Sequence, residues 1–400
     1  MSGGQRMWES SAQRWFGVGH SALANPGAAG TEAATAALAG RSPSLIIVLS
    51  SITYDLPRLL AAIRKVAGAG VAIVGCSSMG EITAHGATDD SVVVAALGGR
   101  GFEVRTRLSR GASGRRHETG MDAARCLASV SRPHRALLLL CDGLTHEHHK
   151  IVRGAYQAVG AAVPLVGGCA ADNLTFTGTY QFYGEDSGVE ITSDSVVGVA
   201  IGSDAPVGVG VAHGWHKTDE AMVVTSSEES RIFELDSEPA LDVYLRLIGE
   251  DRSITDDPDK FHNCAYVHPL GLSRRDGEDI RVVHSADASD GSLTCLANVP
   301  QGVLSWPMET DPGSLIGSAG DSCEQAVKML GGAPPIGLLT FDCGIRKVML
   351  GHDGAQSEVT EMLRVAAGTP IGGLYTFGEI ARTRGSRGMH HLTVATLALA

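Results

Sequence analysis

The chain repeats one arrangement of apolar segments, and this repeat limits the folds that are open to it. In each copy a short apolar run precedes an amphipathic helical pattern, a second apolar run that ends in small residues, and further apolar runs. The second runs read VAIVGCSS (71–78), VPLVGGCAADN (163–173) and PIGGLYTFGEI (370–380). Helical segments between short buried strands are typical of α/β proteins. We therefore predict an α/β fold in which duplicated strand–helix–strand–strand units form mixed sheets flanked by helices, in two similar halves.

The first strand and the helix of each unit follow from the spacing of apolar residues. Strands are expected at 45–51, 136–142 and 337–343, and helices at 56–66, 146–159 and 357–367. Asp55 is expected to cap the first helix, with Pro57 in its first turn. A fourth, weaker copy is expected over residues 231–272, around a helix at 240–248.

The length of 400 residues suggests two domains. A polar stretch at 217–230 predicts the boundary, which gives an N-terminal domain at 41–218 and a C-terminal domain at 219–400. Residues 1–40 are rich in alanine, glycine and serine, and we expect them to be a lead segment that packs only in part.

Composition excludes several classes of partner. The net charge is −12 and no block of lysine or arginine occurs, so we expect no nucleic-acid partner. No signal-type segment and no run of 18 apolar residues is present, so we expect no membrane insertion. The eight cysteines form no CxxC pair, which favours reduced cysteines in a cytoplasmic protein.

Two segments end in Gly-Glu-Ile, and they supply the first candidate site residues. Glu81 and Glu379 each follow an apolar strand and a turn of small residues. Strand ends in α/β units are where ligand clefts form, and a glutamate there can bind an ammonium or a hydroxyl group. The alternative is that each carboxylate accepts backbone N–H bonds and holds a turn. Cys76, in the first of these turns, is either a reactive thiol or a buried core residue.

Arginine and histidine near the C-terminus supply the other candidates. Arg346 directly follows a predicted strand, so it is either an anion clamp or a partner in a salt bridge. His390 lies near Glu379 if the segment between them folds back as a hairpin. His146 and His149 share one face of a predicted helix, but no third ligand has matching spacing, so we predict no metal site.

Several motifs in this order resemble the FIST family, which has an N-terminal and a C-terminal FIST domain. They are GCSSMGEI, GGCAADN followed by TYQFYG, ALDVYLRLIG, FDCGIR, and GGLYTFGEI followed by a late MHH. The resemblance implies a sensory module that binds a small ligand. It also marks Cys343, Arg346, Glu379 and His390 as the positions that match the family's C-terminal pattern. The chain departs from that pattern at Asp342 and His391, where the family has serine and asparagine.

Three functions are therefore carried forward. The first is a stand-alone sensory module in signal transduction that binds an amino acid or related zwitterion, with a downstream signalling protein as partner and no cofactor. The second is a hydrolase or transferase that uses a thiol, Cys343 or Cys76, together with His390. The third is a gas sensor based on haem or a metal, which the family resemblance alone implies. The candidate ligand-binding residues are Cys343, Arg346, Glu379, His390, Glu81 and Cys76.

Overall fold

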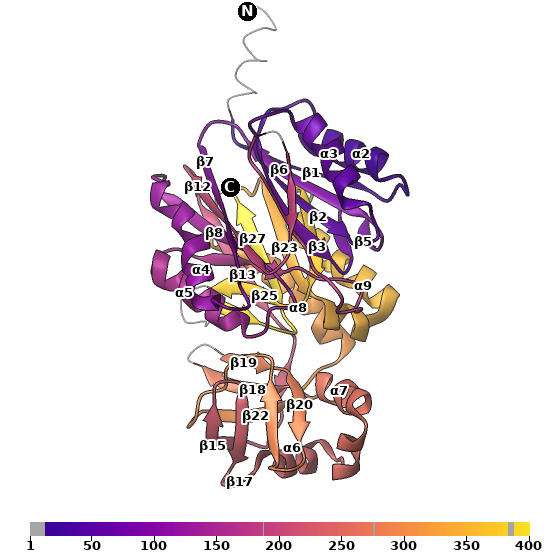
Figure 1. Cartoon of the computed structure of the whole chain (residues 1–400), viewed down its shortest axis with the longest axis vertical. Helices are drawn as coiled ribbons and strands as arrows, with labels where there is room; N and C mark the ends of the chain where they lie inside the picture. Colours follow the sequence, from indigo (N-terminus) through magenta and orange to yellow (C-terminus); the bar gives the residue numbers. More distant parts are fainter. Residues whose placement is uncertain (1–12, 187, 275–276, 383–387) are drawn as a thin grey trace, which may run out of the picture.

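The computed structural model describes residues 13–186, 188–274, 277–382 and 388–400. It has a large body and a small domain that lies at one end of it (Figure 1). The chain leaves the body after residue 212 and returns to it at residue 312, so the small domain is an insertion. The predicted boundary at residue 218 falls near this exit, but residues 312–400 belong to the body.

The body consists of three units with the same order of elements, and both halves of the chain contribute to them. The predicted α/β fold of repeated units with mixed sheets and flanking helices is confirmed. The first unit contains β1 (Trp15–Ser21), α2 (Pro26–Leu38), β2 (Pro43–Ser51), α3 (Leu56–Ala67), β3 (Ala72–Ser78), β4 (Glu81–Thr83), β5 (Gly86–Thr88) and β6 (Val92–Gly98). The second contains β7 (Phe102–Arg110), α4 (Arg116–Ala124), β8 (His134–Cys141), α5 (His148–Val159), β9 (Leu165–Cys169), β10 (Gln181–Gly184), β11 (Glu190–Thr192) and β12 (Ser195–Ser203). The third contains β13 (Val207–Ala212), α8 (Pro312–Lys328), β23 (Gly337–Cys343), α9 (Gly344–Ala366), β24 (Ile371–Thr376), β25 (Glu379–Arg382), β26 (Gly388–His390) and β27 (Val394–Leu399).

Each unit gives its hairpin to the sheet of another unit. The four main strands of a unit pair in the same order, β1-β6-β2-β3, β7-β12-β8-β9 and β13-β27-β23-β24. The edge of each sheet is then extended: β10 pairs with β3, β25 pairs with β9, and β4 pairs with β24. This cyclic exchange joins the three units into one body. In each unit, the turn between the last parallel strand and the hairpin therefore lies where two units meet.

Strands buried on both faces explain the continuous apolar runs of the sequence. In β2, Leu45, Ile47 and Leu49 point into a core shared by all three sheets. Their neighbours Ile46 and Val48 pack against α2 and α3 on the outer face. The helices α4 and α5 cover the second sheet in the same way, and α8 and α9 cover the third (Figure 1).

The helix predictions hold with small changes at the ends. Asp55 caps α3 by accepting a hydrogen bond from the backbone N–H of Arg58 at 3.1 Å. The helix predicted at 357–367 is the second part of α9, which begins at Gly344 and is interrupted at Gly351, where φ is +65°.

The described part of the predicted lead segment, from residue 13 onward, packs more completely than the sequence suggested, and residues 1–12 lie outside the described residues. Residues 15–38 form β1 and α2 of the first unit. A Cβ at Gly17 or Gly19 would lie 2.2 Å or 2.0 Å from a backbone oxygen of α2. The small residues of this segment therefore allow a close approach of helix and strand.

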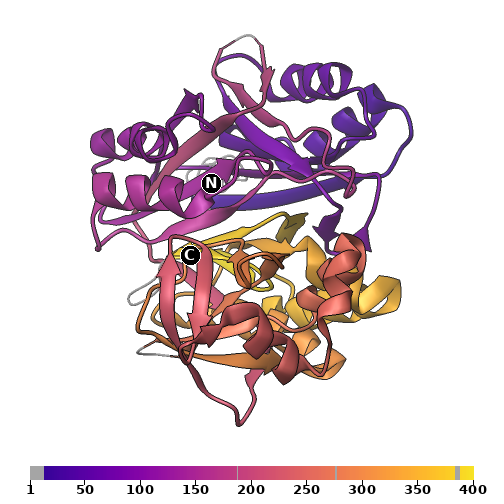
Figure 2. The same ribbon diagram turned by 60° about the horizontal axis from the view of Figure 1, so that its bottom comes forward.

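The small domain differs from the predicted fourth copy. Its strands form an antiparallel sheet, with α6 (Ala240–Ile248) and α7 (Pro258–Tyr266) beside it. The Asp257 side chain caps α7 by accepting hydrogen bonds from two backbone N–H groups, those of Asp259 and Lys260. Residues 258–266 are therefore helical, where the last strand of the predicted fourth copy was expected to begin. Its strands are β14 (His216–Lys217), β15 (Met222–Glu228), β16 (Arg231–Leu235), β17 (Glu238–Pro239), β18 (Leu270–Arg274), β19 (Gly277–Arg281), β20 (Val283–Asp287), β21 (Ser292–Cys295) and β22 (Leu304–Glu309). Figure 2 brings this domain to the front, with the first two units above it.

Candidate functional site

Three polar side chains occupy the same position in the three units. Glu81, Gln181 and Glu379 each begin a hairpin strand that pairs with the sheet of another unit. Their Cα partners are Leu374, Cys76 and Gly168, which are the equivalent positions of β24, β3 and β9. We call these positions the three corners. Sequence inspection found Glu81 and Glu379 but missed Gln181, because an insertion at 170–180 separates it from β9.

A hydroxyl group at the start of the last strand of the same unit, or on the residue just before it, donates to each corner side chain. Ser91 donates to Glu81 Oε2, Ser195 donates to Gln181 Oε1 at 2.8 Å, and Thr393 donates to Glu379 Oε2 at 2.9 Å. The similarity of SVVVAALGG (91–99) to SVVGVAIG (195–202) is the sequence signal that locates the middle corner.

The corners hold uncharged side chains. Glu81 and Glu379 are fully buried, and burial raises the pKa of each to about 8. The hydrogen bonds from Ser78 and Ser91 oppose the rise at Glu81, and those from Thr393 oppose it at Glu379. The amide of Gln181 stands where the other two units have a carboxyl, which agrees with a neutral acid at both glutamates at pH 7.

Cys343 lies beside the Glu379 carboxyl at the end of β23. Its backbone N–H donates to the Thr393 carbonyl at 3.2 Å, and it occupies the N-cap of α9. Burial and the neighbouring Glu379 raise the pKa of the thiol well above its usual value. Cys76 lies inside β3 in the central core, where burial also raises its thiol pKa. Both thiols are therefore protonated at neutral pH, which is unfavourable for nucleophilic attack.

Arg346 is fully buried and already bound within the protein. Its Nε donates to Asp342 at 3.0 Å, and its Nη2 donates to Glu358. Two backbone carbonyls, those of His213 and Leu315, each accept from it at 2.9 Å. An anion that binds Arg346 would have to displace one of these partners, so the anion clamp expected from the sequence is not open in this conformation.

The two C-terminal histidines lie close to the histidines at the start of α5. His390 is buried and donates from Nε2 to the Ala381 carbonyl at 2.9 Å. His391 is 3% exposed, and its Nδ1 has no hydrogen-bond partner in the described part of the chain. Burial, followed by the neighbouring His148 and Arg281, lowers the pKa of His391 well below its usual value. The structure thus brings the HEHHK and MHH segments together, which sequence spacing did not predict.

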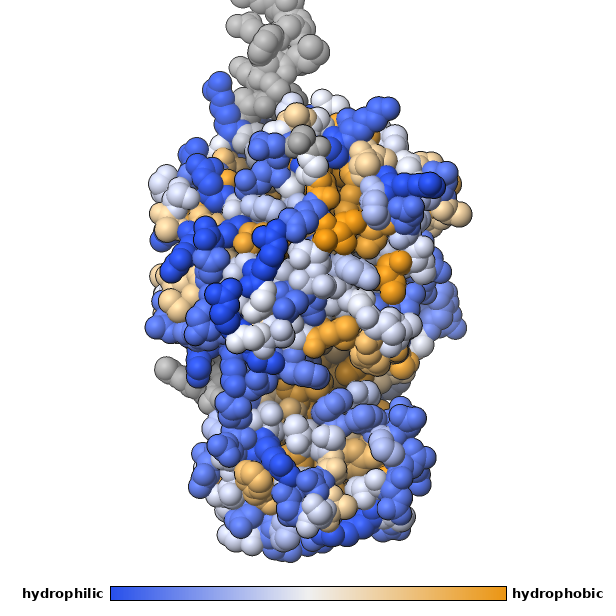
Figure 3. All heavy atoms as spheres, in the orientation of Figure 1, coloured by the Kyte–Doolittle hydropathy of each residue, from blue (hydrophilic) through white to orange (hydrophobic). Residues whose placement is uncertain are grey.

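An apolar cluster joins these strand ends to the small domain. Its buried members include Trp215, Ile280 and Met308 on one side and Cys343 and Leu392 on the other. Half-buried side chains surround it, namely Tyr266, Leu296 and Trp306 of the small domain and Ile345, Met349 and Leu350 of α9. Figure 3 shows the surface drawn in at this level, with apolar side chains set back between body and small domain. We call this region the junction.

Three of the unsatisfied buried polar atoms lie at or beside the junction. Glu379 Oε1 and Trp215 Nε1 are buried without a hydrogen-bond partner among the described residues, as is His391 Nδ1. Buried polar atoms are usually satisfied, so such a group calls for a partner from outside the chain or for water. The middle corner also leaves one atom unsatisfied, Gln181 Nε2, but without a comparable apolar surround at the small domain.

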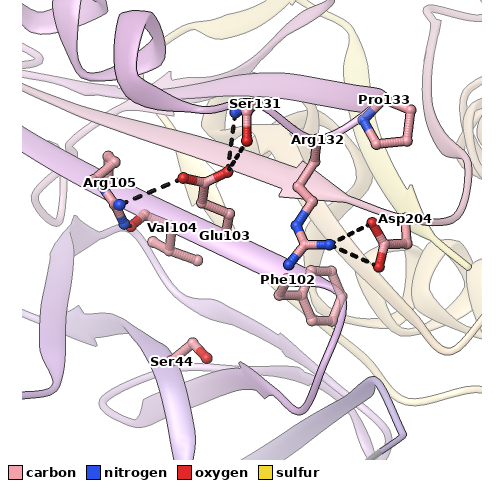
Figure 4. Close-up of a pocket in the computed structure, with 9 residues that line it drawn as sticks. All are labelled: Ser44, Phe102, Glu103, Val104, Arg105, Ser131, Arg132, Pro133 and Asp204. Atoms are coloured by element: carbon pink, nitrogen blue, oxygen red, sulfur yellow. Dashed lines mark hydrogen bonds and ion pairs between the residues drawn. The ribbon is translucent and has the colours of Figure 1, made fainter.

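A surface hollow of about 600 Å³ lies elsewhere on the body, lined by charged residues (Figure 4). Arg132 pairs with both oxygens of Asp204, at 2.8 and 2.9 Å. Glu103 accepts from Ser131 and pairs with Arg105. These charges satisfy one another, so this hollow offers a ligand less than the junction does.

Within the described ranges, no group of three or more His, Cys, Asp or Glu side chains is placed to hold a metal ion. No helix in the same ranges is both long and apolar enough to span a membrane.

Comparison with known proteins identifies both halves of the chain. Residues 44–238 match the FIST N domain and residues 240–382 match the FIST C domain. An uncharacterized protein of Methanocaldococcus jannaschii is 26% identical over 172 residues, which is 41% of this chain and 33% of that protein. The chain thus spans about a third of that relative's length.

Two solved structures of cyanuric acid hydrolase also align with the chain. The enzyme from A. caulinodans has a TM-score of 0.38 and 13% identity, over 96% of this chain and 99% of its own. The second structure has a TM-score of 0.33 and 9% identity, over 97% and 100%. Likeness at this level supports no inference about the chemistry of this chain.

Proposed function

The chain belongs to the FIST family, whose domains are associated with sensory signal transduction, and on this premise we propose that it binds a small ligand at the junction. The observation that carries this proposal is the coincidence of unsatisfied buried polar atoms with half-buried apolar side chains. A ligand with an apolar part and one or two polar groups has the chemistry that this region lacks.

We propose an amino acid or a related zwitterion as the ligand class, with the Glu379 carboxyl as the group that receives the ammonium. Glu379 is neutral at pH 7 because burial raises its pKa to about 8, and an adjacent ammonium stabilises the ionised form. Binding therefore releases a proton. Affinity is expected to rise about tenfold per pH unit between pH 6 and pH 8 if one proton is released.

The position of the small domain supports a sensory role. A ligand at the junction contacts Cys343 and Glu379 at the strand ends and Tyr266 or Trp306 of the inserted domain. A ligand that touches both parts changes the free energy of their contact, and only such a difference can shift a conformational equilibrium.

A thermal-shift screen against amino acids, short carboxylates and haem tests the proposal, because a ligand that binds the folded state raises the melting temperature. The expected result is a shift with wild-type protein that is lost in Glu379→Gln and kept in Glu81→Gln. The second variant is a matched control, since it makes the same change at the equivalent corner away from the small domain. The absence of a shift with every compound, or an equal loss in both variants, would contradict the proposal.

A further inference from the structure

A second hollow lies on the body, at the opposite ends of the same strands. It has a volume of about 990 Å³ and is lined by the starts of β8 and β13, the segment before β9, and the end of β25. The junction lies where β23 and β9 end, whereas this hollow lies where β8 and β9 begin. We call it the basic groove.

The charges that line the groove are of one sign. Its charged residues are Arg135 and Arg382, and none of its described lining residues is an aspartate or glutamate. This contrasts with the hollow of Figure 4, where each arginine has a carboxylate in the lining. A basic lining in a chain with a net charge of −12 favours an acidic partner.

The lining of the groove combines a fixed cation with apolar side chains. The guanidinium of Arg382 lies over the ring of Tyr156, 3.1 Å from its centre, so α5 fixes this cation. The remaining lining is largely apolar, and Met329 at the end of α8 is 50% exposed there. Apolar side chains beside fixed cations match a peptide that alternates acidic and apolar residues, because each kind of side chain then finds its complement.

One short strand connects the groove to the Glu379 corner. The strand β25 begins at Glu379 and ends at Arg382, so the two side chains lie about 10 Å apart along the backbone. Both interior residues of this strand, Ile380 and Ala381, are fully buried. A packed strand rather than a loop therefore joins the corner to the groove.

We propose that the basic groove is a docking site for an acidic, apolar-containing peptide segment of a partner protein. The docking step does not depend on which ligand occupies the junction. Arg135 is exposed and supplies the cation that the partner's carboxylate pairs with, while Arg382 positions the peptide from the opposite side.

Fluorescence anisotropy with labelled octapeptides tests the proposal on the full chain. The probe alternates glutamate and leucine, and the comparison peptide has glutamine in place of every glutamate. We expect the glutamate peptide to bind wild-type protein more tightly, with an affinity that falls as salt rises. Arg135→Glu is expected to weaken binding at least about tenfold.

Arg58→Glu is the matched control, because Arg58 is an exposed arginine on α3 outside the groove. It makes the same change in net charge and is expected to leave peptide affinity within about twofold of wild type. The proposal is overturned if the glutamate peptide does not bind at millimolar concentration, if the glutamine peptide binds as tightly, or if Arg58→Glu and Arg135→Glu weaken binding equally. Because no small ligand is present in this assay, its failure would leave the proposed ligand site standing.

Discussion

Glu81 and Glu379 occupy equivalent corners of the body but differ in how far their oxygens are satisfied. At Glu81, the hydroxyl of Ser78 donates to Oε1 and that of Ser91 to Oε2. At Glu379, the hydroxyl and the N–H of Thr393 both donate to Oε2, and Oε1 has no hydrogen-bond partner among the described residues. In the same architecture, both carboxyl oxygens of Glu81 therefore accept hydrogen bonds, whereas Oε1 of Glu379 can still accept one. We call the first corner closed and the second open.

The surroundings of the two corners differ in the same sense. Glu81 lies near Lys347, whose ammonium is held by Asp89 and by the Met79 carbonyl. Glu379 lies near the Cys343 thiol, and the small domain covers that end of the body. The repeat thus supplies an acid at both corners, and the inserted domain packs against the end of the body that carries Glu379.

The largest expected effect is a loss of folding stability when Arg346, on the Glu379 side of the body, loses its charge. Arg346→Met leaves Asp342 and Glu358 buried without their cation, because all three side chains are 0% exposed. Breaking a buried ion pair in this way costs about 3–5 kcal/mol. Urea unfolding at pH 7 measures the loss.

Arg364→Met is the control on the same helix. Arg364 pairs with Glu361 and Glu324 at the surface, where its side chain is 60% exposed. Exposed pairs contribute little, so its unfolding midpoint should stay near that of wild type. Equal losses in the two variants would contradict the closed, buried state of Arg346.

Both neutral glutamates are expected to contribute to the change of the free energy of unfolding with pH. Folding raises the pKa of Glu81 and Glu379 from 4.5 to about 8, so at pH 7 the folded state binds protons that the unfolded state has released. The contribution of each of these two groups to stability therefore falls as pH rises from 4.5 towards 8. Each group lowers the free energy of unfolding by about 3 kcal/mol between pH 4.5 and pH 7.

Substitution by glutamine separates the two contributions. Glu81→Gln and Glu379→Gln should each remove one share of this pH dependence, and the double variant should remove both, because an amide does not titrate in this range. Urea unfolding at pH 5, 6, 7 and 8 measures the slopes. Slopes in Glu81→Gln and Glu379→Gln that equal the wild-type slope would rule out neutral acids at the corners.

The repeated unit was readable from the sequence because buried strands leave continuous apolar runs and caps leave local signals. Asp55 at the start of α3 and the strand ending at Cys343 are examples. The exchange of hairpins was not readable, since the partner of a sheet edge is set by how units assemble. Gln181 was hidden by the insertion before it, and the closure of Arg346 depends on Glu358, twelve residues further along the chain.

Removal of the corner hydroxyls is expected to have a smaller effect. Thr393→Val removes one of two hydrogen bonds to Glu379 Oε2 and should cost about 1 kcal/mol. Ser91→Ala should cost more, because it leaves Glu81 Oε2 without its donor, whereas in Thr393→Val the backbone N–H of residue 393 still donates to Glu379 Oε2. Chemical unfolding of both variants at pH 6 gives the comparison. A larger loss for Thr393→Val would contradict this difference between the two corners.

Thiol labelling under native conditions is expected to spare both candidate thiols, Cys76 and Cys343. Cys76 and Cys343 are buried with raised thiol pKa values, whereas Cys264 is partly exposed. A thiol reagent should therefore label Cys264 first, and peptide mapping by mass spectrometry identifies the site. Rapid labelling of Cys343 would contradict its burial and would favour the thiol-dependent enzyme over the ligand sensor.

Carboxyl ¹³C NMR of glutamate-labelled protein tests the difference between the corners most directly. We predict two signals that titrate near pH 8, one absent from Glu81→Gln and the other from Glu379→Gln. Addition of the strongest ligand from the screen should lower the pKa of the Glu379 signal and leave that of Glu81 unchanged. Movement of the Glu81 signal instead, or titration of both signals near pH 4.5, would contradict the assignment of Glu379 as the open corner.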